Sequence, residues 1–170
     1  MDFSYKHLLP QDFGDNSRVW IYQADRPFNN SETFGIGKAL NDFVVNWKSH
    51  GVPVKGYANI FFDQFIILMA DEEATGVSGC SIDSSVHVIQ EIGSKFSVDL
   101  LNWQSLAFVV DDKVQIISRQ QFNDALDQSL ITPRTLFFNN VVTTKRDLEE
   151  KWIIPVNESW LKTKIKQTVS

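Results

Sequence analysis

Apolar and polar positions follow two different periods in the first third of the chain. The segment 17–24 (SRVWIYQA) is rich in β-branched and aromatic residues and alternates with period two, which predicts a strand. Beyond it, apolar residues recur at helical intervals from the predicted N-cap Ser31 to Trp47. Gly51 and Pro53 end this predicted helix, because neither residue favours a helix interior.

The middle of the chain predicts two strand pairs separated by a helix. Residues 54–62 and 64–70 are both strand-like, and they form either a hairpin or one long bent strand. A helix is predicted over 82–96, because its apolar residues share one face. The strand-like segments SLAFVV and KVQIIS flank the compact turn Asp111-Asp112, so they form a second predicted hairpin.

The last third of the chain predicts shorter elements. Ser118 and Gln121 have capping-box spacing and open a predicted helix near 119–129. The further predicted elements are a strand at 135–142 broken by Asn139-Asn140, a helix capped by Thr144 that ends near Trp152, an extended segment at 153–156, and a final helix capped by Asn157.

This order of elements favours hairpins over βαβ crossovers and predicts an α+β fold. We expect an antiparallel or mixed sheet of about five to six strands, covered by about three to four helices. Residues 1–16 are predicted to be an irregular arm, because prolines, glycine and asparagine interrupt them. No linker or repeat divides the chain, so residues 1–170 are predicted to form a single globular domain.

Composition and charge narrow the class of protein. The 170 residues are 43% hydrophobic and 22% charged, which is typical of a globular domain with its own core. The net charge of −5 is opposite to that of most nucleic-acid-binding domains, so nucleic acid is not the expected partner. The longest apolar run, FIILMA at 65–70, is too short to cross a membrane. We therefore expect a cytoplasmic protein without a membrane partner.

The cysteine content and the glycine spacing exclude several kinds of site. The single cysteine, Cys80, cannot form an internal disulfide or a four-cysteine zinc site. Gly51 and Gly56 have the spacing of a nucleotide-binding Walker A loop, but Tyr57 stands where lysine is required. Lys38 follows a glycine, but Glu32 occupies the position of the first glycine. We predict no cofactor and no metal.

The segment 74–85 (ATGVSGCSIDSS) is the strongest candidate for chemistry. It joins a predicted strand to a helix start, where free backbone amides and the helix dipole favour an anion or a reactive thiolate. The predicted ligand-binding residues are Gly76, Ser78, Gly79, Ser81 and Ser84. The alternative is structural: the glycines make the turn, Ser81 or Asp83 caps the helix, and Cys80 is a small buried residue.

A stripe of polar residues on the same helix offers a partner for the thiol. Asp83, His87 and Glu91 follow at intervals of four, and Cys80 falls near their stripe. We predict Cys80 and His87 as candidate catalytic residues, with a carboxylate orienting the imidazole. The alternatives are a metal site and an ordinary solvated helix face, since the stripe lies opposite the apolar face.

Four segments resemble a known family: YKHLLPQDF (5–13), SRVWIYQADR (17–26), ATGVSGCSIDSS (74–85) and WIIPVNESW (152–160). They are similar to those of a family of small uncharacterised proteins from Bacteroidetes bacteria, and the resemblance covers nearly the whole chain. Members often carry the label "ABC transporter ATPase", which implies an ATP-dependent function. VSGCS at 77–81 is a partial echo of the LSGGQ-type signature of such ATPases.

Three functions therefore stand as hypotheses. The first is a non-enzymatic binding or assembly module, because no strong catalytic motif is present; self-association as a homo-oligomer belongs to this hypothesis. The second is an enzyme or redox protein that depends on Cys80. The third is the ATP-dependent function that the resemblance implies. The sequence leaves open whether the protein is an enzyme and which partner it meets.

Overall fold

The computed structural model describes residues 1–73 and 79–168, except for the side chains of residues 79–81 and 166–168. The strands are β1 (Arg18–Gln23), β2 (Lys48–Ser49), β3 (Val52–Pro53), β4 (Lys55–Phe61), β5 (Phe65–Asp71), β6 (Ser105–Val110), β7 (Lys113–Ser118), β8 (Leu136–Phe138) and β9 (Ile153–Pro155). The α-helices are α1 (Asn30–Asn46), α2 (Gly79–Phe96), α3 (Phe122–Asp127), α4 (Lys145–Lys151) and α5 (Lys162–Thr168). Short 3-10 helices cover Lys6–Leu8, Arg119–Gln121 and Val156–Glu158.

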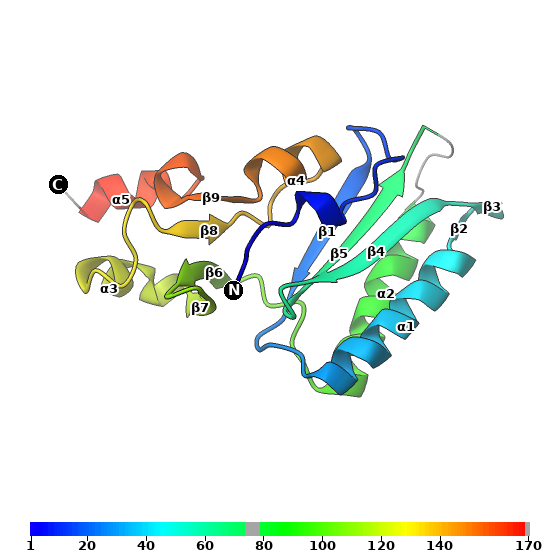
Figure 1. The fold of residues 1–170 in the computed structure, drawn as a ribbon, viewed down its shortest axis with the longest axis horizontal. Coiled ribbons are helices and arrows are strands. Elements are labelled where there is room, and N and C mark those ends of the chain that lie inside the picture. Colours follow the sequence, from blue (N-terminus) through cyan, green and yellow to red (C-terminus); the bar gives the residue numbers. More distant parts are fainter. Residues whose placement is uncertain (74–78, 169–170) are drawn as a thin grey trace.

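The described strands form three antiparallel sheets, which confirms the predicted α+β class. Their orders are β1-β5-β4, β2-β3 and β7-β6-β8-β9. Figure 1 shows α1 and α2 side by side against the three-stranded sheet, while the four-stranded sheet lies at the other end of the molecule with α3 and α5. The sheets are smaller than the one predicted, because β1 and the segment after β8 pair only at a single bridge, Arg18 with Thr144.

Strand β5 is the centre of the three-stranded sheet and explains the longest apolar run. All seven of its residues are buried. Phe65, Ile67 and Met69 pack into one core cluster, while Ile66 and Leu68 pack into a second cluster on the helix side. Because β5 is covered on both faces, its residues are apolar throughout and do not alternate between apolar and polar.

Both predicted hairpins form, and their turns show why. Strands β4 and β5 pair from Phe61 and Phe65 outward, with positive φ at Phe62 and Asp63, so the hairpin alternative is the correct one. Strands β6 and β7 are joined by Asp111 and Asp112, which both have positive φ. Two consecutive left-handed residues give the twist that suits the two-residue loop between β6 and β7, whereas the loop between β4 and β5 has Gln64 as a third residue.

The start of α1 differs from the prediction by two residues. Asn29, and not Ser31, is the N-cap: its side chain accepts a hydrogen bond from the backbone of Glu32, whose carboxylate accepts one from the backbone of Asn29. Arg26 donates two hydrogen bonds of 2.9 Å to the same carboxylate. These bonds from Arg26 and Asn29 lower the pKa of Glu32 to about 2. The reciprocal pair satisfies more helix-end amides than a serine alone could.

Of the three helix caps predicted after residue 110, two are confirmed and one is wrong. Ser118 and Gln121 form a reciprocal capping box, and the hydroxyl of Thr144 accepts a hydrogen bond from the backbone of Asp147, both as predicted. Asn157 is not a cap: it lies inside a 3-10 helix. The hydroxyl of Ser159 instead accepts a hydrogen bond from the backbone of Leu161, just before α5 begins.

The N-terminal arm is irregular, as predicted, but it is also part of the core. Tyr5, Leu9 and Phe13 are buried and cover the face of the three-stranded sheet opposite the helices. The Tyr5 hydroxyl donates a hydrogen bond of 2.6 Å to the carbonyl of Leu148, and its ring meets Trp152 edge-on at 4.9 Å. These contacts hold α4 against this face of the sheet. Figure 1 shows the arm running beside α4.

Replacing Tyr5 with phenylalanine tests this fastening. Tyr5→Phe leaves a buried carbonyl without its donor, so we expect a loss of about 1 kcal/mol in the free energy of unfolding at pH 7. Burial raises the pKa of Tyr5 to about 12. In the unfolded chain the Tyr5 hydroxyl ionises near pH 10, whereas in the folded chain it stays protonated up to about pH 12. The free energy of unfolding therefore falls as pH rises from about 10 toward 12.

Above pH 10, the free energy of unfolding should fall less steeply with pH in Tyr5→Phe than in the native protein, because the variant lacks the Tyr5 phenol that titrates there. Urea unfolding followed by circular dichroism, at pH 7 and at several values above pH 10, measures both effects. Equal stability at pH 7 together with an equal alkaline slope would contradict the assigned role of Tyr5.

Candidate functional site

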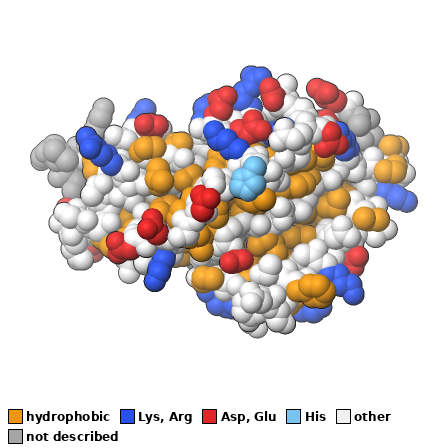
Figure 2. Space-filling model, viewed as in Figure 1, with side chains coloured by type: hydrophobic (Ala, Val, Ile, Leu, Met, Phe, Trp, Pro, Cys, Tyr) orange, Lys and Arg blue, Asp and Glu red, His pale blue; other side chains and the backbone are white. Residues whose placement is uncertain are grey.

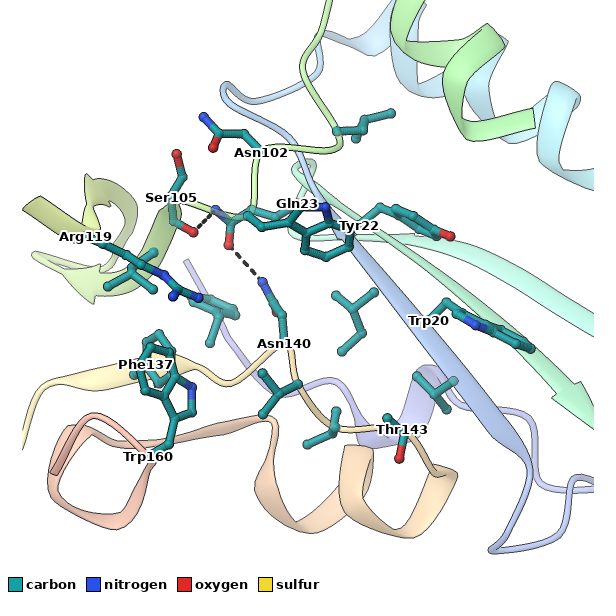
Figure 3. Close-up of a pocket in the computed structure, with 18 residues that line it drawn as sticks. Trp20, Tyr22, Gln23, Asn102, Ser105, Arg119, Phe137, Asn140, Thr143 and Trp160 are labelled. Atoms are coloured by element: carbon teal, nitrogen blue, oxygen red, sulfur yellow. Dashed lines mark hydrogen bonds between the residues drawn. The ribbon is translucent and has the colours of Figure 1, made fainter. Parts of the chain in front are cut away.

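A pocket of about 300 Å³ lies where the three-stranded and four-stranded sheets diverge. It is lined by β1, the segment 100–106, residues 137–143, Arg119 and Trp160. Figure 3 shows Arg119, Phe137 and Trp160 at one end, Thr143 and Trp20 at the other, and Gln23 and Asn140 between them. The rings of Trp20 and Tyr22 extend from β1 toward the helix side, where both residues pack in the second core cluster.

The pocket exists because a strand edge is left open. The backbone of Val19 donates a hydrogen bond of 2.9 Å to the carbonyl of Thr143, so the Val19 N–H points away from β5. Alternation along an antiparallel strand then turns the N–H and C=O of Ile21 to the same open side. In the described part of the chain, no backbone hydrogen bond beyond the β1–β5 ladder reaches Ile21. The pocket wall thus offers both a backbone donor and a backbone acceptor.

Three hydrogen bonds that involve the side chains of Trp152, Asn140 and Gln23 maintain the shape of the pocket. The Trp152 Nε1 donates to Asn140 Oδ1 at 2.9 Å, and Asn140 Nδ2 donates to Gln23 Oε1 at 2.9 Å. Gln23 Nε2 in turn donates to the carbonyl of Ser105 at 3.4 Å. Because an indole nitrogen can only donate, it determines the orientation of the Asn140 amide, which then determines that of Gln23.

One end of the pocket carries donors that lack acceptors. The guanidinium of Arg119 lies 5.2 Å from the ring centre of Trp160 and forms no salt bridge within the described residues. The Nε1 of Trp160 is buried and has no hydrogen-bond partner among the described residues. Arg119 is also the only charged residue among the described residues that line the pocket.

The remaining walls are mainly apolar. Leu106, Phe137 and Val142 are buried, whereas Trp103 is 62% exposed and Val141 is 63% exposed. No motif marked these residues, because they come from separate elements and share no spacing. The isolated Trp103 between polar neighbours was the one signal in the sequence, since a large exposed indole is unusual without a contact.

The segment that the sequence favoured falls partly outside the described residues. Gly76 and Ser78 lie outside them. The backbones of Gly79, Cys80 and Ser81 form the first turn of α2, but their side chains also lie outside the description. The helix therefore starts three residues before the predicted 82. Binding of an anion by this segment stays a prediction.

The structure places the rest of the predicted stripe beside α1. Ser84 is exposed and lines a surface groove between α1 and α2, together with Asp83, His87, Glu91 and Asp42. His87 Nε2 lies 3.1 Å from Glu91 Oε1, as the spacing predicted. Three carboxylates and one cation, Lys48, border this groove, so carboxylates outnumber cations around Ser84 and do not favour an anion there.

The predicted pairing of Cys80 with His87 falls partly outside the described residues, because the side chain of Cys80 is not among them. The two residues are seven positions apart on α2, which corresponds to a rise of about 10 Å along the helix axis. Among the described His, Cys, Asp and Glu side chains, no three gather in a way that could hold a metal ion. A catalytic Cys80–His87 pair stays a prediction.

Comparison with known proteins adds no assignment. No protein-family model, no curated protein and no solved structure matches this chain. Within the described residues, no helix is both long enough and apolar enough to span a membrane. On the face shown in Figure 2, Lys and Arg alternate with Asp and Glu around a belt of hydrophobic side chains, without a separate basic patch. The pocket between the two larger sheets is therefore the feature of this chain that points to a function.

The Asn140 side chain links Trp152 to Gln23 by two hydrogen bonds, and we call this link the Asn140 bridge. Removing it should lower the stability of the protein. Asn140→Leu keeps the size of the side chain but leaves the buried Trp152 Nε1 without an acceptor. We expect the free energy of unfolding to fall by about 1–3 kcal/mol, measured by urea unfolding. Asn157→Ala is the matched control and should change it by less than about 0.5 kcal/mol, because Asn157 caps no helix. Equal effects of the two substitutions would contradict the bridge.

The thiol hypothesis makes a separate prediction. If His87 activates Cys80, iodoacetamide labels Cys80 with an apparent pKa below the ordinary ~8.5, and His87→Gln slows the labelling at neutral pH. Mass spectrometry across a pH series gives both quantities. Equal labelling rates in the native protein and the variant, or an ordinary thiol pKa, would contradict the catalytic pair.

Proposed function

We propose that this chain is a non-enzymatic binding module whose ligand is a small, mainly apolar molecule held in the pocket between the sheets. The single observation that carries the proposal is the pocket of about 300 Å³, since this volume falls at the lower end of known ligand sites. Its walls combine apolar side chains with a few polar groups, which is the usual composition of such sites.

The chemistry of the lining favours binding over catalysis. Among the described residues that line the pocket there is no Asp, Glu, His, Lys or Cys. General acid–base catalysis relies mostly on these side chains, and the hydroxyls of Ser105 and Thr143 in the lining have no such base among the described lining residues to activate them as nucleophiles. The groups that are present, Arg119 and the amides of Gln23 and Asn140, can orient a ligand by hydrogen bonds without exchanging protons at neutral pH.

Preorganisation also supports the proposal. The bonds among Trp152, Asn140, Gln23 and Ser105 tie both sides of the pocket together, so the cavity does not depend on a ligand to stay open. A site that is already shaped loses less conformational entropy on binding. Trp103 and Val141 at the rim expose apolar surface that a ligand would cover.

The neutral dye N-phenyl-1-naphthylamine tests the proposal, because its fluorescence rises in apolar surroundings. We expect saturable binding to one site per chain. Val141→Trp should weaken binding on the order of tenfold by filling the rim, and Trp103→Ala should weaken it by removing an aromatic wall. Phe34→Ala is the control, since Phe34 is 78% exposed on α1 and does not line the pocket.

Fluorescence titration gives the dissociation constant of each variant, and circular dichroism verifies that each is folded. Non-saturable binding, or equal effects of the rim variants and of Phe34→Ala, would contradict the proposed pocket function.

A further inference from the structure

We infer that the ligand of this pocket is an organic anion: an apolar body with one carboxylate, sulfonate or phosphate group, which Arg119 and Trp160 bind at one end. This inference rests on the proposed function and specifies the class of ligand. It follows from how charge and unsatisfied donors are distributed in the described part of the chain.

Arg119 differs from the arginines that have a structural partner. Arg18, Arg26 and Arg146 each form a salt bridge, with Glu72, Glu32 and Asp15 respectively. Arg119 and Arg134 form none among the described residues, although the chain carries a net charge of −5, and of these two only Arg119 lines the pocket. Its guanidinium instead lies over Trp160, at the end of the pocket. A cation at a pocket wall without a carboxylate beside it is available to an anionic ligand.

The indole of Trp160 supplies a second, independent reason. Its Nε1 is buried and has no acceptor among the described residues. A buried N–H without an acceptor costs free energy, which an oxygen of a bound ligand would recover once the partly exposed ring turns its N–H toward the pocket. Arg119 and Trp160 therefore present a charged donor and a neutral donor at one place, which suits a group with several acceptor oxygens.

The contact between Arg119 and Trp160 orders the arginine side chain before a ligand binds at this end of the pocket. Stacking against the indole restricts the long arginine side chain, so less rotamer entropy remains to be lost when an anion binds. The planar guanidinium can offer two parallel N–H donors to a carboxylate or phosphate, which a lysine cannot.

The opposite end of the pocket has a different character. Figure 3 shows Thr143 and Trp20 at this end. The lining also includes the apolar side chains of Ile21, Val141 and Val142, and Arg119 is the one charged residue among the described lining residues. A small inorganic anion would leave this apolar volume unfilled, whereas a neutral apolar molecule would leave Arg119 unpaired. An amphipathic organic anion satisfies both ends at once.

Two dyes that share a ring system test the inference. 8-Anilinonaphthalene-1-sulfonate has the skeleton of N-phenyl-1-naphthylamine and adds one sulfonate. We expect the native protein to bind the sulfonate dye more tightly than the neutral dye, and Arg119→Gln to weaken only the sulfonate dye, by about tenfold. Arg119→Lys should restore part of this loss. Raising the NaCl concentration should weaken the sulfonate dye selectively.

Arg134→Gln is the matched control, because it removes the same charge from an exposed turn outside the pocket. Inorganic phosphate at millimolar concentration should compete weakly with the sulfonate dye and leave the neutral dye bound.

The possible results separate the two proposals. If the neutral dye binds in the pocket and Arg119→Gln lowers the affinity for both dyes equally, or for neither, the anionic ligand class is overturned while the pocket function stands. If the neutral dye does not bind saturably, the pocket function itself is overturned. Selective weakening of the sulfonate dye by Arg119→Gln, and not by Arg134→Gln, supports the inference.

Discussion

The hydrogen bonds of the Asn140 amide are the constraint on which the arrangement of the two larger sheets depends. One atom of that amide accepts from Trp152 and the other donates to Gln23, whose own amide reaches the start of β6. These bonds connect the last residue of β1, the turn after β8 and the end of α4. Because Trp152 is fully buried, its N–H requires an acceptor, and Asn140 cannot be exchanged for an apolar residue without leaving it unsatisfied.

The same constraint creates the pocket. Residues 143–145 begin to pair with β1 at the bridge between Arg18 and Thr144, but the turn at Asn139 and Asn140 carries the preceding chain away from the strand edge. The sheet therefore stops growing at β1, and a space remains between Ile21 and Val142. Protein interiors are otherwise closely packed, so a cavity held open by satisfied polar groups indicates a site more than a packing defect.

Local signals predicted most of the secondary structure, and they failed where a distant residue decided the outcome. The turn at Asp111-Asp112 and the caps at Ser118 and Thr144 depend on residues a few positions apart, so the pattern was sufficient. The cap at Asn29 is an exception, because Asn29, Glu32 and Arg26 lie within six positions of one another and the capping-box spacing was present in the sequence. The N-terminal arm looked irregular because it has no period of its own, and its burial comes entirely from contact with other elements.

The sequence by itself determined the α+β class, both hairpins and the helix starts at Ser118 and Thr144, because these follow from spacing along the chain. It directed attention to the segment 74–85, where glycines, serines and the cysteine lie together. Only the tertiary structure brought Ile21, Trp103, Arg119, Asn140 and Trp160 around one space. Their proximity depends on where two sheets diverge, and this depends on contacts between residues more than a hundred positions apart, which no local pattern encodes.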